Sequence, residues 1–408
     1  MIDWESIRSD FPMLSRTMEQ HPLVYFDNGA TTFKPQSVID RVLHYYQEEN
    51  VNVHRGDYEL SGVVTSRFDA VRTQVAQFIN AQANEIILTS GTTEAINIVA
   101  LGLLNSISEK DRVVTVLSEH SSNILPIFNI VHETGCQLAY LQSDELGKIV
   151  TENLEETITE NTKLVAINHV SNVLGYINPI ADVIKRAHQV GAKVIVDGAQ
   201  AAPHLPLDMQ ALDCDFYAFS AHKMCGPNGV GVLYGKYSEL EKLNPVLMGG
   251  GANSRFYQDG RITFSKIPDR FEPGTRNIEG VLGFGESIKY LSKLSMEQIH
   301  QRELELLNYL YPKLEALDHV IILNPNPDIA LISFNVKGIF AQDVASYLSH
   351  HGIAVRAGTH CAKLLPKVIG AGESVRISLY FYNTFAEIDY FIQVLSEISL
   401  EKTIDLYL

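Results

Sequence analysis

The sequence predicts an α/β fold in which a mostly parallel sheet, of the seven-stranded type, lies between helices, followed by a smaller α+β domain. Short apolar runs alternate with helical patterns from about residue 60 to about residue 240, and the pattern changes after about residue 285. Several of the runs are apolar throughout, which indicates strands covered on both faces, as in parallel sheets. A ligand of such a sheet is expected at the carboxyl ends of the strands.

The first domain begins with short β-branched runs that are separated by helical spacing, for example at residues 180–190. Its predicted strands are residues 85–88, 113–117, 164–168, 194–196, 216–219 and 231–234.

The second domain begins with a charged helix at residues 295–317, with a possible kink at Pro312. Strands are expected at 329–335, 353–356 and 375–380, and helices at 342–351 and 386–399. We therefore divide the chain into an N-terminal segment (1–22) that packs on the small domain, a large domain (23–285) and a small domain (286–408).

The composition is that of an acidic globular protein. Of its 408 residues 46% are hydrophobic, and 48 acidic against 32 basic residues give a net charge of −16. This balance argues against nucleic acid as a partner, and no apolar stretch is long enough to cross a bilayer. The first residues lack the features of a signal peptide. We expect a cytoplasmic protein with no membrane partner.

The four cysteines are scattered and form no CxxC pair, so neither a disulfide framework nor a metal site is expected. Cys136 and Cys214 follow ordinary patterns and are expected to be packing residues.

The strongest chemical signal is Lys223, which stands between small polar residues and a glycine-rich turn. A lysine amine can form a Schiff base with an aldehyde cofactor. Asp197 ends a strand that is expected to be buried, where an unpaired carboxylate is costly and needs a cation or several donors. A pyridinium N–H supplies both, so the two residues suggest a pyridoxal phosphate site. The alternatives are a surface lysine and an aspartate that caps its turn.

A phosphate cradle is expected where Thr92 and Thr93 follow a strand and open a helix. Backbone N–H groups at a helix N-terminus bind anions, and threonine hydroxyls add donors. A capping box is the alternative interpretation. Ser220 and His222 flank Lys223 and are natural phosphate donors as well.

Further polar residues follow predicted strands at the same edge of the sheet. A neutral His120 could stack on a flat ring and pass protons, although a histidine in this place is often only a satisfied polar residue. Asn172 could hydrogen-bond a phenolate oxygen, and Gln200 could reach the same ring as Asp197.

A second chemical signal lies far downstream, on a short glycine-bearing loop. Cys361 follows a histidine and lies near Arg356, in surroundings that favour a thiolate. A buried, inert cysteine is the alternative. Arg376 on the next strand could bind a substrate carboxylate through two hydrogen bonds, or form an ordinary salt bridge.

Together these motifs resemble those of the cysteine desulfurases, which belong to the class V aminotransferase superfamily of fold type I pyridoxal phosphate enzymes; the SufS-like group is the most similar. The resemblance runs nearly end to end. It is carried by Tyr25-Phe-Asp-Asn-Gly-Ala, Val53-His-Arg-Gly, Ser90-Gly-Thr-Thr-Glu, His169-Val-Ser-Asn-Val-Leu-Gly, Val196-Asp-Gly-Ala-Gln, Ser220-Ala-His-Lys, Arg270-Phe-Glu-Pro-Gly-Thr and Arg356-Ala-Gly-Thr-His-Cys-Ala.

The resemblance implies a role for each matching residue. Lys223 would bind the cofactor covalently and later move the α-proton of the substrate, and His120 would stack on the ring. Asp197 would bind the pyridine nitrogen, with Gln200 and Asn172 on the phenolate side. The phosphate group would be held by Thr92, Thr93, Ser220 and His222 and by Thr275 of the neighbouring subunit, and the substrate by Arg376, Arg356, His54 and Asn172.

The same resemblance implies an activity. L-cysteine would be converted to alanine while Cys361 attacks the substrate sulfur and keeps it as a persulfide. The persulfide would pass to an acceptor protein of iron–sulfur cluster assembly. The role of Thr275 implies a homodimer.

Three residues depart from the family pattern. Thr359 replaces a histidine of the usual Gly-His-His-Cys loop, Gln342 stands where relatives with a zinc-containing acceptor have histidine, and Arg276 replaces a common proline. Several other activities remain open: a selenocysteine lyase, an aminotransferase or kynureninase-like enzyme of the same class, and a sulfur carrier without cofactor that uses only Cys361.

Overall fold

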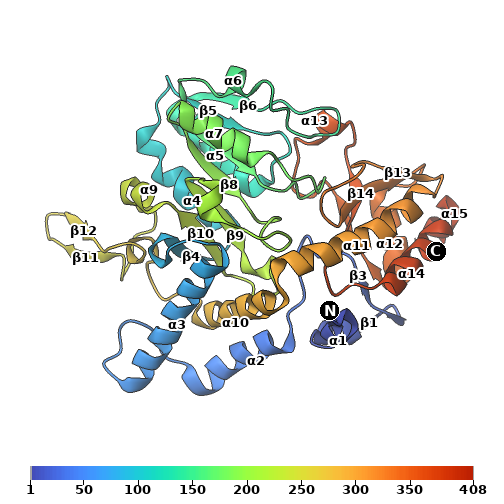
Figure 1. Ribbon diagram of the computed structural model, residues 1–408, viewed down its shortest axis with the longest axis horizontal. Helices are drawn as coiled ribbons and strands as arrows, with labels where there is room; N and C mark the ends of the chain where they lie inside the picture. The colour runs from blue at the N-terminus through green and yellow to red at the C-terminus, as the bar shows by residue number, and fades with distance from the viewer. Residues whose placement is uncertain (1, 408) are drawn as a thin grey trace.

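The computed structural model describes residues 2–407. It consists of two parts, each with a sheet and helices, joined by a long helix (Figure 1). Met1 and Leu408, the outer ends of the predicted domains, lie outside the described residues.

The larger part is built on a seven-stranded sheet in the order β4-β10-β9-β8-β7-β5-β6. Neighbouring strands are parallel except at β10, which is antiparallel to both β4 and β9, so the predicted mostly parallel sheet is confirmed. The strands are β4 (Ile86–Thr89), β5 (Arg112–Thr115), β6 (Gln137–Tyr140), β7 (Thr162–Asn168), β8 (Lys193–Asp197), β9 (Phe216–Ser220) and β10 (Gly231–Gly235).

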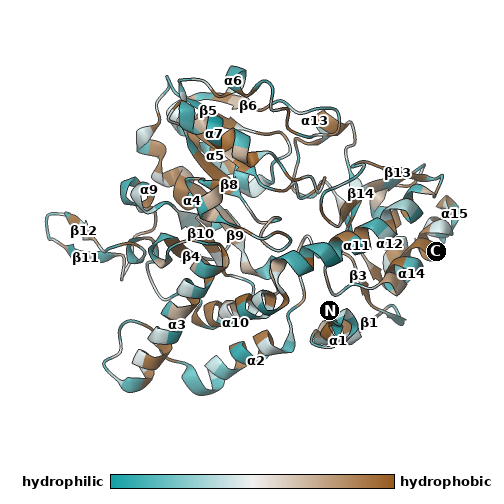
Figure 2. Cartoon of the chain, viewed as in Figure 1, coloured by the Kyte–Doolittle hydropathy of each residue, from teal (hydrophilic) through white to brown (hydrophobic). Residues whose placement is uncertain are grey.

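The central strands are covered on both faces, which explains their continuous apolar sequences. In β7, Leu164 and Ala166 point into one hydrophobic core, whereas Val165 and Ile167 point into the other. In Figure 2 the strands are largely brown between helices that carry teal outer faces. The sequence did not predict β6, an edge strand whose residues are partly exposed and therefore show little hydrophobic contrast.

Helices form a layer on each face of this sheet. α4 (Thr92–Gly102) and α5 (Ser121–Thr134) share one core with it. α3 (Glu59–Phe78), α7 (Ile180–Gln189) and α10 (Ile278–Leu294) share the other. Outside these layers lie α2 (Gln36–His44) and the hairpin β11 (Asn253–Phe256)–β12 (Ile262–Phe264), which projects from the body in Figure 1.

The smaller part contains a four-stranded antiparallel sheet with its own hydrophobic core. Its order is β13 (Val320–Ile322), β14 (Leu331–Val336), β17 (Ser374–Ser378) and β16 (Arg356–Gly358). Helices α12 (Ala341–His350) and α14 (Phe385–Ser396) pack on it.

Two elements of the smaller part differ from the prediction. The strand expected at 353–356 is two strands, because β15 (Ile353–Ala354) pairs with β3 (Val24–Tyr25) whereas β16 pairs with β17. The last helix ends at Ser396, and a separate helix, α15 (Leu400–Ile404), follows Ser399, whose side chain caps it.

Helix α11 (Met296–Glu315) links the two parts and continues through Pro312. Its first turns share the large core and its later turns the small core. The expected boundary at 285/286 lies within α10, and we propose Ser295, between α10 and α11, as the boundary instead. Val24 and Phe26, expected in the large domain, belong to the small core because β3 pairs there.

The N-terminal helix α1 (Trp4–Arg8) contacts the segment that follows β17. The Trp4 and Phe381 ring centroids are 6.0 Å apart, and Arg8 forms an ion pair of 2.6 Å with Glu387. These contacts support the proposed packing on the small domain, but Phe11 and Leu14 belong to the large core, so the segment contacts both parts.

Candidate active site

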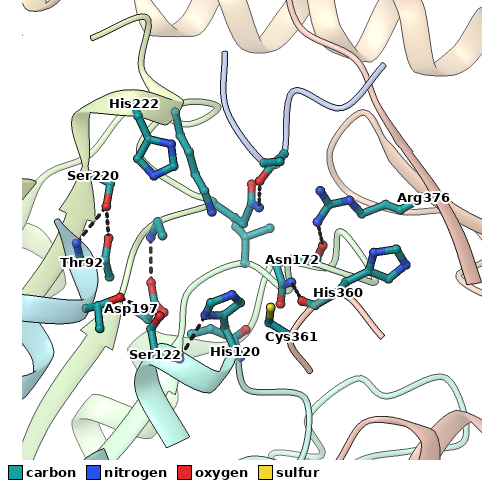
Figure 3. Close-up of a pocket in the computed structure, with 18 of the residues that line it drawn as sticks. Thr92, His120, Ser122, Asn172, Asp197, Ser220, His222, His360, Cys361 and Arg376 are labelled. Carbon is teal, nitrogen blue, oxygen red and sulfur yellow. Dashed lines mark hydrogen bonds between the residues drawn. The ribbon is translucent and has the colours of Figure 1, made fainter. Parts of the chain in front are cut away.

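A cavity of about 220 Å³ lies at the carboxyl ends of the central strands and is also lined by the loop before β17 and by β17 itself. Figure 3 shows Thr92, Ser220 and His222 at one side of this cavity and His360 and Arg376 at the other. Twelve of the predicted site residues line it: Thr92, Thr93, His120, Asn172, Asp197, Gln200, Ser220, His222, Lys223, Arg356, Cys361 and Arg376.

One end of the cavity is suited to an anion. The Thr92 N–H, at the start of α4, donates to Ser220 Oγ over 2.8 Å, and the Thr92 and Ser220 hydroxyls lie 2.7 Å apart. Burial, with Lys223 and Lys34 nearby, lowers the pKa of His222 to about 4, so this imidazole is neutral at neutral pH. The end therefore offers neutral donors and a helix N-terminus.

Asp197 ends β8 and is 5% exposed. Burial raises its pKa, while the Ala199 N–H, which donates to Oδ1 over 2.9 Å, and Lys223 oppose that rise. Nearby, Gln200 Nε2 donates to the Gly29 carbonyl over 2.8 Å, whereas Gln200 Oε1 is buried and has no partner among the described residues. Both side chains therefore have unused capacity toward a polar ligand.

Lys223 lies at the end of a short 3₁₀ turn (Ala221–Lys223) that follows β9. Burial lowers the pKa of its amine to about 8; Asp197 opposes this effect, and Arg376 and Arg356 add to it. A larger share of this amine is neutral near neutral pH than for an exposed lysine, and only the neutral amine is nucleophilic.

His120 is the N-cap of α5 and accepts the Ser122 N–H at Nδ1 over 3.1 Å. Burial, together with Lys223, Arg376 and Arg356, lowers its pKa to about 4. The ring is therefore neutral at neutral pH and carries its proton on Nε2. A neutral ring is what the stacking role would require, and that role stays a prediction.

Cys361 lies on a loop with two consecutive left-handed residues, His360 (φ 51°) and Cys361 (φ 59°). The Ser121 N–H and hydroxyl both donate to the Cys361 carbonyl over 2.8 Å, and Asn172 Nδ2 donates to the His360 carbonyl over 2.8 Å. These bonds hold the thiol-bearing loop against the large domain. Figure 3 shows Cys361 close to His120 and Asn172 in this view.

The histidine before Cys361 does not supply positive charge. Burial, with Arg376 and Arg356 nearby, lowers the pKa of His360 to about 3, and its Nε2 lies 2.9 Å from Ser374 Oγ. This imidazole is therefore neutral at neutral pH, whereas the guanidinium groups of Arg356 and Arg376 line the same cavity.

Arg376 is 2% exposed and lies on β17. Its Nη1 donates to the Asn172 carbonyl over 2.9 Å (Figure 3), and its Nη2 lies 3.0 Å from Asp27 Oδ1. It thus forms a salt bridge and lines the cavity as well, so the two interpretations from the sequence are compatible.

Two predicted residues lie outside this cavity. Thr275 lines a separate pocket of about 140 Å³ with Ser90 and Glu94. His54 was expected beside Arg376. Its backbone N–H donates to Thr65 Oγ1 and its ring contacts Phe68, and both of these residues belong to α3.

The cavity also contains residues that the sequence reasoning missed. Ser122 and Asn168 follow or end predicted strands, so their position alone could have indicated them. Gly29 and Ala30 belong to a motif that carried the resemblance but received no role. The missed lining residues are Gly29, Ala30, Ser122, Asn168, Val170, Ala199 and His360.

Two of the departures from the family pattern have local partners. Gln342 Nε2 donates to Glu373 Oε2 over 2.7 Å, and Arg276 Nη2 donates to the Phe271 carbonyl over 2.8 Å. Within residues 2–407, no group of His, Cys, Asp or Glu is arranged to hold a metal ion, and no helix is both long and apolar enough to cross a membrane.

Comparison with known proteins assigns the family. Residues 24–391 match the model of the family Aminotransferase class-V. The chain is 43% identical over 405 residues to a probable cysteine desulfurase of Synechocystis, covering 98% of this chain and 95% of the relative.

Two solved structures are similar over nearly the whole chain. The apo cysteine desulfurase of Thermococcus onnurineus has a TM-score of 0.92 at 36% identity and covers 97% of this chain and 98% of its own. The cysteine desulfurase CsdA of Escherichia coli has a TM-score of 0.90 at 32% identity and covers 100% and 99%. The chain therefore belongs to the class-V aminotransferase family and, within it, to the cysteine desulfurases.

Proposed function

We propose that this protein is a pyridoxal-phosphate-dependent cysteine desulfurase that converts L-cysteine to L-alanine and keeps the sulfur on Cys361. The observation that carries the proposal is that Lys223, from the large domain, and Cys361, from the small domain, line one cavity together with Arg376. A cofactor-binding amine, a thiol and a carboxylate-binding cation are the groups that this reaction needs.

The residues of the cavity fit pyridoxal phosphate. Asp197 is a buried carboxylate that could accept a hydrogen bond from a cationic N–H group. Gln200 Oε1 is buried without a hydrogen-bond partner among the described residues and could accept one from the same ligand. The N-terminus of α4 and the Ser220 hydroxyl fit the phosphate group. Lys223 lines the same cavity and would bind the aldehyde carbon, with the neutral His120 against the ring.

When bound, this cofactor withdraws electrons from the substrate, so that the bonds of the carbon that carries the substrate's amino group break more easily. The chain supplies the remaining tasks. Arg376 binds the substrate carboxylate, and the Lys223 amine takes and returns the α-proton. Because the pKa of Lys223 is lowered to about 8, the amine exchanges protons readily near neutral pH.

The sulfur step balances without an external oxidant or reductant. The Cys361 thiolate attacks the sulfur of L-cysteine, an S–S bond forms, and the substrate C–S bond breaks. The carbon skeleton keeps the electron pair of that bond and is protonated at the same carbon. The products are L-alanine and a persulfide on Cys361.

The partners of the protein are part of the same proposal. Cys361 passes its sulfur to an acceptor protein for iron–sulfur cluster assembly in the cytoplasm. The protein acts as a homodimer in which Thr275 reaches the phosphate of the other subunit. An exposed apolar patch on and near the β11–β12 hairpin supports this dimer; it contains Leu247, Met248, Phe256 and Ile262.

The test is alanine release from L-cysteine by the purified protein and two variants. Cys361→Ser should abolish release from L-cysteine, and Lys223→Ala should abolish both release and the visible absorbance of the bound cofactor. If Cys361→Ser spares release from L-selenocysteine alone, the protein has both activities and only the first needs the thiol. Undiminished cysteine turnover in Cys361→Ser would refute the proposal.

A further inference from the structure

Two arginines face each other across the end of the small sheet. Arg356 on β16 and Arg376 on β17 are direct partners in the antiparallel register, and both line the cavity. Like charges directly opposite each other destabilise a sheet. This pair therefore needs a counter-charge even before any substrate arrives.

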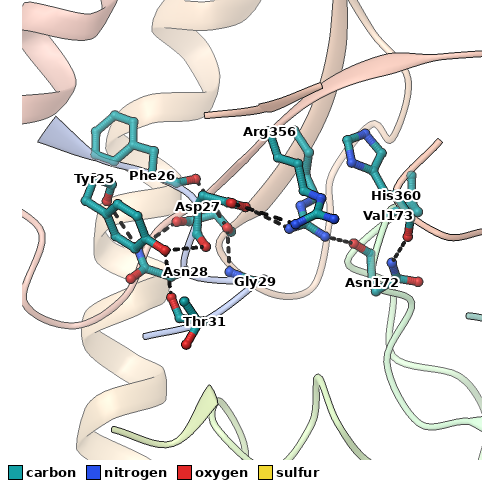
Figure 4. A network of polar contacts seen from close by, with 12 residues as sticks. Tyr25, Phe26, Asp27, Asn28, Gly29, Thr31, Asn172, Val173, Arg356 and His360 are labelled. Atoms are coloured by element: carbon teal, nitrogen blue, oxygen red, sulfur yellow. Dashed lines mark hydrogen bonds and ion pairs between the residues drawn. The ribbon is translucent and has the colours of Figure 1, made fainter. Parts of the chain in front are cut away.

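Asp27 supplies that counter-charge from outside the sheet. Its Oδ1 lies 3.0 Å from Arg376 Nη2, and its Oδ2 lies 4.0 Å from Arg356 Nη1. Each carboxylate oxygen thus faces a different guanidinium, and Figure 4 shows the contact of Asp27 with Arg356. Asp27 itself does not line the cavity, so it lies behind the two cations.

The segment around Asp27 is held firmly in place. The Tyr25 hydroxyl donates to the Asp27 carbonyl over 3.1 Å and to the Thr31 carbonyl over 2.9 Å. A Cβ at Gly29 would come within 3.2 Å of Arg376 Cζ and Nη2, so glycine lets the backbone approach the guanidinium closely. The carboxylate is therefore fixed relative to Arg376.

The charges at this end of the cavity can be counted. Among Arg356, Arg376 and Asp27, two guanidinium groups face one carboxylate, which leaves one positive charge of this group unbalanced. Lys223 lines the same cavity, but its amine would be bonded to the cofactor in the loaded protein. The nearby His360 and His120 are neutral, because burial and these same cations lower their pKa to about 3 and about 4. One positive charge matches the single carboxylate of a neutral amino acid such as L-cysteine.

We infer that Asp27 is a specificity-determining residue that acts through Arg376 and Arg356, limiting the pocket to amino acids with one acidic group. A second acidic group on the substrate side chain would lie in the same cavity as Arg356 and Arg376. With Asp27 present, the positive charge of Arg356 and Arg376 is already partly neutralised by the Asp27 carboxylate, so a second acidic group is attracted less strongly. The inference rests on the proposed function for the identity of the substrate.

The test compares L-aspartate with L-asparagine, which has nearly the same shape but an uncharged side chain. Dissociation constants are measured by calorimetry on the cofactor-loaded protein, so the result does not depend on sulfur release. In Asp27→Asn, affinity for L-aspartate relative to L-asparagine should rise by about tenfold, because the pocket gains a second unbalanced positive charge. Asp27→Glu, which keeps the carboxylate, should stay near the parent ratio.

The matched control is Asp389→Asn, which removes the same charge from an exposed carboxylate that pairs with Lys313 on the far side of the small domain. Arg356→Gln provides a second measurement should Asp27→Asn fold poorly, and it should lower the relative affinity for L-aspartate. An unchanged ratio in both Asp27→Asn and Arg356→Gln, or an equal shift in Asp389→Asn, would overturn the inference. If the affinity ratios are as predicted but the parent protein does not convert L-cysteine, only the proposed function is contradicted.

Discussion

The conformation of the Cys361 loop depends on Ser121, the first residue of α5. His360 and Cys361 both adopt left-handed backbone angles, each of which costs about 1–2 kcal/mol for a residue with a side chain. Three hydrogen bonds oppose this strain: two from Ser121 to the Cys361 carbonyl and one from Asn172 to the His360 carbonyl. These three bonds therefore help to hold the loop against the large domain.

Ser121→Ala removes one of these bonds and leaves the Ser121 N–H bond intact. A single hydrogen bond contributes about 1 kcal/mol, which corresponds to about a fivefold change in the population of the open loop. We expect iodoacetamide to alkylate Cys361 about fivefold faster in this variant, as followed by mass spectrometry. The visible absorbance of the cofactor should not change, because Ser121 does not line the cavity.

The control is Ser396→Ala, which removes a similar hydroxyl bond to a backbone carbonyl, that of Gln393, at the end of α14. It should leave the alkylation rate of Cys361 unchanged. A rate in Ser121→Ala within twofold of the parent would show that the loop is not held by this bond, and the reasoning would fail.

Three further predictions concern stability and the cofactor. Glu272→Ala should lower the free energy of unfolding by about 3–5 kcal/mol in urea, because it leaves the buried Arg72, 2.6 Å from Glu272, without its partner; a loss below about 1 kcal/mol would contradict this. Asp197→Asn should weaken cofactor binding by at least about tenfold in a spectral titration, because a hydrogen bond to a charged group is lost, and an unchanged affinity would count against the assigned role. The rate at which the cofactor-free protein takes up pyridoxal phosphate should rise with pH through about 8, since Lys223 is protonated below its lowered pKa and neutral above it; a midpoint near 10 would instead indicate an ordinary lysine.

The sequence predicted the sheet and most of the cavity because both have strong local signals. Buried strands have continuous apolar runs, and Asp197 and Asn172 follow such runs at the edge where ligands bind. β6 was missed because an edge strand has no such contrast.

What the sequence could not show depends on contacts between distant segments. Asp27 and Arg376 are 349 positions apart. The pairing of β3 with β15 and the bridge between Asp27 and Ser378 bring the first segment beside the small sheet. The sequence also did not show that His54 lies against Phe68 of α3, because a motif does not reveal which helix its side chain contacts. The neutral state of His360 follows from its burial beside two arginines and not from its neighbour in the chain.

The central claim is that Cys361 takes the sulfur from a substrate that Lys223 activates. It is tested most directly by mixing the cofactor-loaded protein with one equivalent of L-cysteine and locating the added sulfur by peptide mass spectrometry without reduction. The account predicts one extra sulfur atom on the peptide that contains Cys361, formed together with one alanine, and none in Lys223→Ala. Alanine formed with no sulfur on Cys361, or with the sulfur on another cysteine, would contradict it.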